Sequence, residues 1–331
     1  MKFFVCVALL AVVPAVFGAG WSYNNDNPRE EWHLIPGSYC NGTSQSPINI
    51  NTSIAIHIDL GSLSPDGYTE ANPNLEIVNN GHGITVQLHE AVEAFYTLSG
   101  GGLPTTYTAS QFHFHWGSIN SQGSEHLINS NAFPAELHMV HYDRAKYADL
   151  VAALTSLQWD AVTAVGVMIE IGEDENTAFK SVLDYVSQIA NYSSGNTSLS
   201  LPSFSIRSVL PFDLARFYRY NGSLTVPNCY ESVIWNVLEE PISISQAQLD
   251  TLRNVYGDTR DSAGNYETTV NNYRLVNPLN DRTLYYSRPE DQGEGDETST
   301  PEPTDGGAVA ISPMRALFIV ALALCMLFNR F

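Results

Sequence analysis

Gln111-Phe112-His113-Phe114-His115-Trp116 is the stretch that decides the fold, because polar and aromatic residues alternate strictly along it. Successive side chains of a β-strand point to opposite faces, so His113 and His115 share one face and the aromatic residues share the other. One face is therefore apolar enough to be buried in a core, and the other carries two imidazoles. The stretch predicts a strand of a sheet with a polar site on one side.

The segments on either side of this stretch also favour a mainly β protein with peripheral helices. Short alternating or β-branched runs separated by turn residues predict strands over Leu75–Val78, Ile84–Leu88, Ala109–Trp116, Ala135–Val140 and Ala164–Ile171. Helical patterns are fewer, and they predict helices over Leu150–Leu157, Phe179–Ala190 and Gln246–Val255, with Ser245 as the cap of the last one.

A third imidazole comes from His138, which lies in the next predicted strand. The loop 117–124 connects the two strands and allows them to pair antiparallel. Three neutral histidines can bind Zn²⁺ at about 2.0–2.1 Å and leave the fourth position open to water, which is the catalytic arrangement. The pKa of such a water can fall to about 7, which gives a hydroxide nucleophile at neutral pH. A His-X-His pair in a strand is more often structural, and spacing alone does not decide between the two interpretations.

The first 20 residues have the layout of a secretory signal peptide. Lys2 precedes the apolar run Phe3–Phe17, and small residues follow it. The run is shorter than the roughly 20 residues needed to cross a bilayer. We expect residues 1–20 to be removed, with cleavage after Gly18 or Gly20.

The last residues resemble a signal for a glycosylphosphatidylinositol (GPI) anchor. The apolar tail Ala316–Phe328 follows a spacer, and small residues precede that spacer. The candidate attachment residues are Asp305, Gly306 and Gly307. The alternative is a short transmembrane helix flanked by Arg315 and Arg330.

The intervening chain divides into one large domain and a linker. Residues 289–307 are acidic, rich in Pro, Gly, Ser and Thr, and lack an apolar period, which is typical of a solvated linker. No such stretch interrupts residues 21–288, so they are expected to form a single domain, and residues 308–331 are expected to be removed as the anchor signal. The formal net charge of −20 argues against nucleic-acid binding, which needs a basic surface.

The cysteines and the glycosylation motifs agree with a secreted chain. Cys6 and Cys325 lie in the segments expected to be removed, so Cys40 and Cys229 remain as an even pair in an oxidising compartment and predict one disulfide. Asn-X-Ser/Thr tripeptides offer candidate glycosylation sites at Asn41, Asn51, Asn191, Asn196 and Asn221.

Motifs spread through nearly the whole domain carry a family resemblance. They are Ser44–Ile50, Asn79–His82, Gln111–Gly117, Gly123–His126, Ala135–His138, Gly222–Thr225, Trp235 and Glu240–Ser243. Together they resemble the alpha-class carbonic anhydrases. The resemblance implies a large twisted, mostly antiparallel sheet with the metal in a conical cleft. It also implies reversible hydration of carbon dioxide to bicarbonate and a proton.

Carried over position by position, the resemblance assigns roles within the site. His113, His115 and His138 match the zinc ligands, and Gln111 and Glu136 match the groups that accept their ring N–H bonds. Thr225 matches a hydroxyl that donates to Glu125 and accepts from the zinc-bound hydroxide, which aims the attacking lone pair. His82 matches a proton shuttle working through ordered water, because an imidazole with a pKa near 6.5 suits that relay.

The remaining correspondences describe the walls of the cleft and the core around it. The polar side matches Tyr23, Asn80 and Thr85, and the apolar wall for carbon dioxide matches Val140, Ala164, Leu224, Val233 and Trp235. Ser46, His126 and Tyr220 match a buried structural network, and His141 is expected to be structural because it has the opposite strand phase.

Three residues depart from the family pattern. Val226 stands where many members carry a polar residue, and Ala164 replaces a bulkier one, which should widen the substrate pocket. Asn228 follows Pro227 where many members have a second proline in a cis peptide, and a Cys40–Cys229 disulfide like that of secreted relatives can hold this loop. None of these changes removes a predicted ligand or the predicted shuttle.

The prediction is therefore a zinc-dependent carbonic anhydrase on the outer face of the plasma membrane, with bicarbonate transporters as candidate partners. The alternative is a non-catalytic surface domain of the same fold, used for binding or adhesion. Retention of three zinc histidines together with Glu125 and Thr225 argues against it. A zinc hydroxide can also attack activated esters as a secondary activity. A metalloprotease is disfavoured because the chain has no His-Glu-X-X-His motif.

Overall fold

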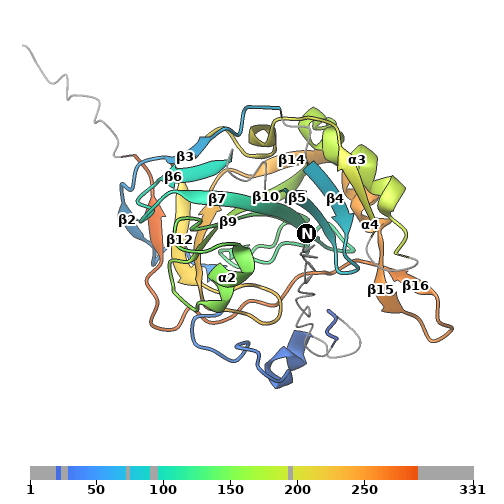
Figure 1. Ribbon diagram of the computed structural model, residues 1–331, viewed down its shortest axis with the longest axis horizontal. Helices are drawn as coiled ribbons and strands as arrows, with labels where there is room; N and C mark the ends of the chain where they lie inside the picture. The colour runs from blue at the N-terminus through green and yellow to red at the C-terminus, as the bar shows by residue number, and fades with distance from the viewer. Residues whose placement is uncertain (1–19, 24–28, 72–74, 90–95, 193–196, 290–331) are drawn as a thin grey trace, which may run out of the picture. The chain divides into compact units, whose positions relative to one another are not determined.

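The computed structural model describes residues 20–23, 29–71, 75–89, 96–192 and 197–289 (Figure 1). Strands dominate: β1 Asn49–Ile50, β2 Ile56–Ile58, β3 Leu63–Asp66, β4 Leu75–Asn79, β5 Ile84–Leu88, β6 Thr97–Gly100, β7 Tyr107–Trp116, β8 Leu127–Ile128, β9 Ala135–Tyr142, β10 Val162–Gly172, β11 Thr197–Leu201, β12 Phe217–Gly222, β13 Val233–Leu238, β14 Ile242–Ser245, β15 Tyr256–Arg260, β16 Tyr266–Thr268 and β17 Tyr285–Ser287. Each strand predicted from the sequence is present, with ends that differ by at most two residues.

A mixed sheet of 13 strands forms the centre of the molecule. Its main path runs β11-β4-β5-β7-β9-β10-β13-β12-β17-β2, with β14, β3 and β6 paired to strands of that path. Most pairs are antiparallel, while β10 runs parallel to both β13 and β14, and β17 runs parallel to β2. The predicted fold class, mainly β on one large and mostly antiparallel sheet, is confirmed.

The described helices are short and lie around the sheet. They are α2 Leu150–Thr155, α3 Thr177–Ile189 and α4 Gln246–Arg253, with the 3₁₀ turns η1 Arg29–Leu34 and η2 Ile206–Val209. α3 and α4 pack against each other beside β4 and β14 (Figure 1). The side chain of Ser245 accepts from Gln248 N–H and Gln248 bonds back to the cap, so the predicted cap is a complete capping box.

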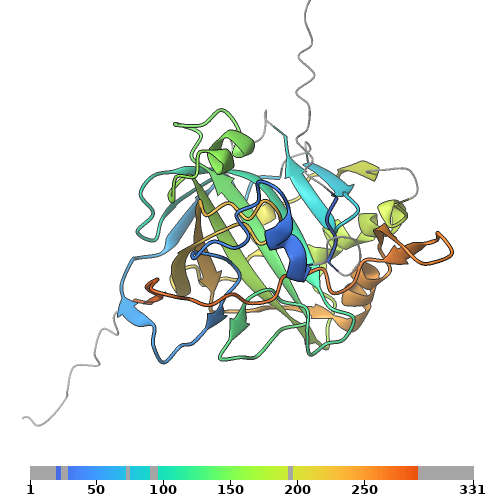
Figure 2. The same cartoon turned by 90° about the horizontal axis from the view of Figure 1, so that it is seen from below.

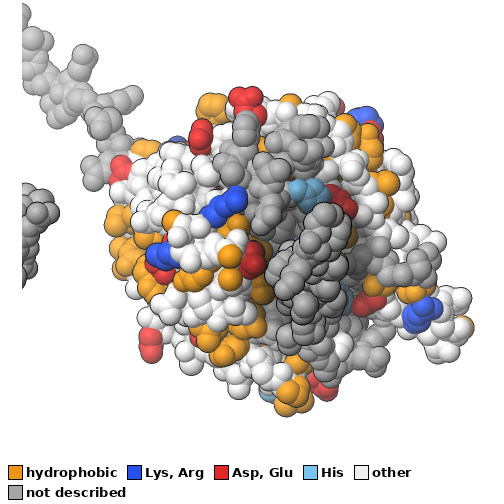
Figure 3. Space-filling model, viewed as in Figure 1, with side chains coloured by type: hydrophobic (Ala, Val, Ile, Leu, Met, Phe, Trp, Pro, Cys, Tyr) orange, Lys and Arg blue, Asp and Glu red, His pale blue; other side chains and the backbone are white. Residues whose placement is uncertain are grey.

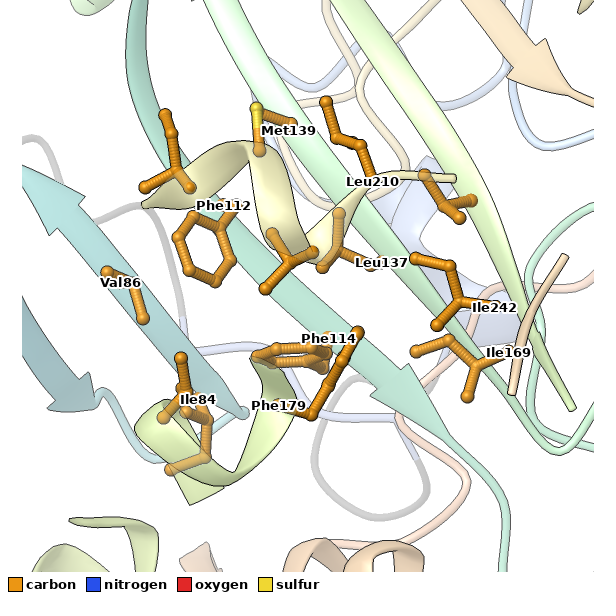
Figure 4. Packing of buried hydrophobic residues seen from close by; sticks show 14 of the residues in the cluster. Ile84, Val86, Phe112, Phe114, Leu137, Met139, Ile169, Phe179, Leu210 and Ile242 are labelled. Atoms are coloured by element: carbon orange, nitrogen blue, oxygen red, sulfur yellow. The ribbon is translucent and has the colours of Figure 1, made fainter. Parts of the chain in front are cut away.

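The aromatic face of β7 is buried as its alternation predicts. Phe112 and Phe114 extend from β7 into a cluster with Leu137 from β9 and Phe179 from α3 (Figure 4). All four side chains are at most 1% exposed. Burial of this face fixes the strand register, because a slip of one residue would turn the histidine face into the core.

The antiparallel pairing of β7 with β9 determines which polar side chains meet on the other face. His113 lies directly opposite His138, and His115 lies directly opposite Glu136. Residues paired across two strands point to the same face, so the three histidines converge.

A two-stranded hairpin, β15–β16, extends from the body of the molecule (Figure 2). On the face drawn in Figure 3, the Lys and Arg side chains lie singly among other residues and form no continuous basic surface. Among the described residues, no helix is both long enough and apolar enough to span a bilayer.

Several predicted features lie outside the described residues: the signal segment 1–19, Asn196, and the linker and anchor candidates Asp305, Gly306 and Gly307. The other glycosylation candidates, Asn41, Asn51, Asn191 and Asn221, are all exposed. The predicted disulfide between Cys40 and Cys229 is formed, with the two Cα atoms 5.0 Å apart.

Candidate metal centre

The imidazoles of His113, His115 and His138 form a compact cluster on one face of the β7–β9 pair. Each offers one ring nitrogen, and these three nitrogens all lie within 4.8 Å of one another. The ring centroids are 5.0 Å, 5.2 Å and 4.7 Å apart. His115 and His138 are buried, and His113 is partly exposed.

Hydrogen bonds from neighbouring side chains hold two of the three rings. His113 Nδ1 lies 2.9 Å from Gln111 Oε1, and His138 Nε2 lies 2.8 Å from Glu136 Oε1. Both oxygens only accept, so these ring nitrogens carry the protons, and His113 Nε2 and His138 Nδ1 keep their lone pairs. Gln111 and Glu136 are the residues that the sequence proposes as acceptors for these two rings.

The third ring is held by a residue that sequence reasoning missed. His115 Nδ1 donates to the backbone carbonyl of Asn272 at 2.6 Å. The side chain of Asn272 accepts from Trp116 N–H at 2.8 Å and donates to the carbonyl of His82 at 3.1 Å. Asn272 lies almost thirty residues after the last family motif, in a segment without a hydrophobic period. Only the folded structure therefore shows its contact with His115.

The electrostatic setting favours the neutral forms of His113 and His115. Burial lowers the pKa of His113 well below its ordinary value, and the neighbouring His115 and His138 lower it further. Burial also lowers the pKa of His115, with Glu125 opposing the shift. Neutral imidazoles with free lone pairs are the form that coordinates zinc.

A buried nitrogen without a partner tests whether the cluster suits a metal ion. His115 Nε2 is inaccessible to solvent and has no hydrogen-bond partner among the described residues. A buried polar atom normally has a partner, and each exception needs an explanation. A zinc ion bound by this nitrogen together with His113 and His138 supplies one, so the residues present fit the metal.

A second cluster, His126, Glu136 and His138, is also compact, but its groups are already bonded to one another. Glu136 Oε1 accepts from His126 at 2.7 Å and from His138 at 2.8 Å, and Oε2 accepts from two backbone N–H groups at 2.8 Å. His126 also meets Tyr220 at 2.7 Å, and Tyr220 donates to Ser46 at 2.8 Å. This network has no free lone pair aimed at a common point, which favours a structural role.

Glu125 departs from its expected contact. Its Oε1 accepts from the backbone N–H of Arg274 at 2.7 Å, and its Oε2 has no hydrogen-bond partner among the described residues. The expected donation from Thr225 is therefore not formed in this structure. Oε2 instead lies 3.4 Å from His115 Nε2 and 3.8 Å from His138 Nδ1.

The predicted apolar wall belongs to one buried cluster beside the histidines. It contains Val140, Ala164, Val233 and Trp235, with Leu224 packed against it. The Trp235 ring lies 4.6 Å from the His138 ring, and its indole N–H donates to the carbonyl of Ser223 at 3.0 Å. These contacts hold the 223–225 segment next to the metal centre.

The loop after Thr225 is fixed from the other side. Cys229, bonded to Cys40, donates its N–H to the carbonyl of Val226 at 2.8 Å. The Pro227–Asn228 peptide bond is cis. His141, on the opposite face of β9, bonds to the Tyr68 hydroxyl and lies 3.3 Å from the Thr163 carbonyl, away from the three histidines.

The predicted polar residues gather around His82. Asn80 Oδ1 accepts from the backbone N–H of His82 at 3.0 Å, and Asn80 Nδ2 lies 3.5 Å from the Thr85 hydroxyl. Tyr23 and His82 line the same cavity of about 350 Å³. Asn272 connects this region to the three histidines, because its side chain donates to the His82 carbonyl and its own carbonyl accepts from His115.

Comparison with known proteins adds to this geometry. The model of the eukaryotic-type carbonic anhydrase family matches residues 27–288. Carbonic anhydrase 7 of Homo sapiens is 35% identical over 267 residues, which is 80% of this chain and 96% of that protein. The Mus musculus protein of that name is 35% identical over 266 residues, with the same shares covered. Carbonic anhydrase 12 of Homo sapiens is 32% identical over 275 residues, which is 82% of this chain and 74% of that protein.

Proposed function

The chain belongs to the eukaryotic-type carbonic anhydrase family, and we propose that it is an active, zinc-dependent member that interconverts carbon dioxide and bicarbonate. One observation carries the proposal. Three imidazole nitrogens with free lone pairs converge from β7 and β9, and His115 Nε2 has no partner among the described residues. A metal ion bound by these three nitrogens would supply the missing partner.

His113, His115 and His138 would hold the metal, and Gln111, Glu136 and the Asn272 carbonyl keep their rings in the coordinating tautomer. A zinc ion held by three neutral ligands lowers the pKa of a coordinated water to about 7, which supplies hydroxide at neutral pH. The residues around it then determine orientation, water exclusion and proton export.

The apolar wall provides a surface against which carbon dioxide can lie without competing water. Val140, Ala164 and Val233 are each at most 5% exposed and offer no hydrogen-bonding side chain. An apolar pocket favours an apolar gas over a water molecule, which would lose hydrogen bonds there. Thr225 is proposed to orient the attacking oxygen, with Glu125 as the acceptor of its hydroxyl proton once the site is loaded.

His82 is proposed to carry the proton from the site to external buffer. The proposal is supported by its polar surroundings and by Asn272, whose side chain donates to the His82 carbonyl and whose own carbonyl accepts from His115. An imidazole is suited to this work because its ordinary pKa lies near neutral pH.

The enzyme is proposed to act outside the cell, attached to the membrane by a GPI anchor. The Cys40–Cys229 disulfide supports the oxidising compartment, because such bonds are rare in the cytosol. The apolar segments at both ends of the sequence support secretion and anchoring. Carbon dioxide and bicarbonate are the proposed substrate and product, and bicarbonate transporters the proposed partners.

The test is stopped-flow carbon dioxide hydration on the purified protein, with zinc content measured on the same sample. We expect about one zinc per chain and rapid hydration that a chelator removes and added zinc restores. Bound zinc with no hydration would contradict the proposed activity. A folded protein with neither zinc nor hydration would favour the alternative of a surface-binding domain.

A further inference from the structure

A carboxylate from the β15–β16 hairpin lies next to the proposed proton shuttle. Asp258 Oδ1 is 3.6 Å from His82 Nδ1. The hairpin backbone is held against the turn that carries His82, because Asp258 N–H donates to the carbonyl of Gly81 at 3.0 Å. A Cβ atom added at Gly257 would lie only 2.4 Å from the Gly81 oxygen, so the two backbones are in direct contact.

The other side of the imidazole is also held. The Trp21 ring stacks on the His82 ring, with centroids 3.9 Å apart and the planes 20° apart. The His82 side chain is 26% exposed and the Asp258 side chain 37%, so the pair still reaches water. Both residues line the 350 Å³ cavity, together with Glu267 from β16.

We propose that Asp258 is a positioning residue for proton export by His82. The carboxylate only accepts, so it favours the tautomer with the proton on Nδ1 and leaves Nε2 as the basic nitrogen. It also faces the imidazolium that forms after Nε2 takes up a proton. One proton enters the ring per turnover and one leaves to a buffer base, which returns the imidazole to its neutral form. This inference rests on the proposed activity and on the proposed role of His82.

The groups around the imidazole determine in which direction the Asp258 contact shifts the pKa of His82. Burial lowers the pKa of His82, and the Asp258 carboxylate opposes that shift. Among the described residues, the other ionisable groups near the ring are Tyr23 and Glu267, which line the cavity, and Tyr192, which packs against Gly81. Removal of the Asp258 charge should lower the pKa of His82 further, away from the value near 7 that proton exchange with the site requires.

The experiment compares Asp258→Asn, Asp258→Glu and wild type by stopped-flow hydration in weak and in concentrated buffer. In weak buffer, kcat should fall about three- to tenfold in Asp258→Asn, and its pH profile should move to lower pH. Because carbon dioxide attack precedes proton export, kcat/KM should stay within twofold of wild type. Imidazole buffer should restore kcat, and Asp258→Glu should retain most of it.

Two further variants separate positioning from a general charge effect. Glu267→Gln removes an identical charge from the same cavity without a contact to His82, and its kcat should change less than twofold. In a His82→Ala background, Asp258→Asn should have no additional effect. An unchanged kcat for Asp258→Asn, an equal loss for Glu267→Gln, or an additive double variant would overturn the inference. A wild-type protein with zinc but no hydration would instead overturn the proposed function.

Discussion

The β7–β9 strand pair and the rim around His82 are built in different ways. The strand pair brings together His113, His115 and His138 from a short stretch of chain, and its backbone ladder fixes which side chains face each other. The rim combines Trp21, His82 and Asp258, which are far apart in the sequence and meet only through loop and hairpin packing. Where a ladder sets the geometry, the chemistry can be deduced from alternation, and elsewhere only the folded chain reveals it.

The largest effect should come from breaking the strand pair. His113→Ala removes one of three nitrogens that converge within 4.8 Å. We expect loss of bound zinc and of detectable hydration, because two imidazoles cannot complete the open tetrahedral site. Zinc content and stopped-flow hydration measure this, with exposed His33 changed to Ala as the matched control. Retained zinc in His113→Ala would show that the cluster is not the metal site.

The opposite face of β9 offers a test in the acid range. Burial lowers the pKa of His141 from its ordinary value of 6.5 to about 4. The folded form therefore stays neutral while the unfolded chain takes up a proton as pH falls below about 6.5, so stability is full at neutral pH and declines on acidification. From pH 7 to pH 5 this residue should account for about 2 kcal/mol of the lost free energy of unfolding.

Denaturant unfolding at pH 7 and pH 5 checks this value. His141→Gln keeps a donor for the Thr163 carbonyl and an acceptor for the Tyr68 hydroxyl but does not titrate. The variant should lose about 2 kcal/mol less stability over that interval than wild type does. Equal losses in the two proteins would show that His141 is already protonated in the fold or is reached by water.

Much of the strand pair was predictable from the sequence, whereas several of its supports were not. Alternation gave the faces of β7 and β9, and the family motifs gave Gln111 and Glu136. Sequence reasoning did not identify Asn272, Arg274 or Asp258, because these residues follow the last recognised motif. Their segments show no hydrophobic period, so nothing local indicates what they contact. The expected Thr225–Glu125 bond is not formed although Glu125 Oε2 has no hydrogen-bond partner among the described residues, and the Arg274 N–H that binds Oε1 comes from that same part of the chain.

A smaller loss of zinc affinity should follow when a histidine ring is free to rotate but is still present as a ligand. Gln111→Ala deletes the acceptor 2.9 Å from His113 Nδ1, so the ring can rotate and its tautomer is no longer fixed. Loss of such a partner typically costs about 10- to 100-fold in metal affinity. Equilibrium competition with a chelator measures the zinc affinity. Gln87→Ala is the control, because Gln87 lies on β5 opposite Gln111 of β7 but contacts none of the three histidines in the described structure. Unchanged affinity would mean that the ladder alone orients the imidazole.

The smallest effect should come from the rim. Gly257→Ala would place a Cβ atom 2.4 Å from the Gly81 oxygen, so the hairpin must move away from the turn that carries His82. We expect kcat in weak buffer to fall about two- to threefold while zinc affinity stays unchanged, because the proton path is altered and the ligands are not. Gly264→Ala, at the tip of the same hairpin, is the control for backbone strain alone, because the residue has a φ of +85° but the new methyl would have no atom within 4 Å.

The pair of glycine variants decides how independent the two regions are. If Gly257→Ala behaves like Gly264→Ala, the hairpin adapts without moving Asp258, and close packing is not what positions the rim. If zinc affinity falls together with kcat, the shift has passed through Asn272, which bonds both to the His82 carbonyl and to His115. The rim and the strand pair would then move together. The difference between the two regions would lie in how far each can be predicted from the sequence, and not in their action in the protein.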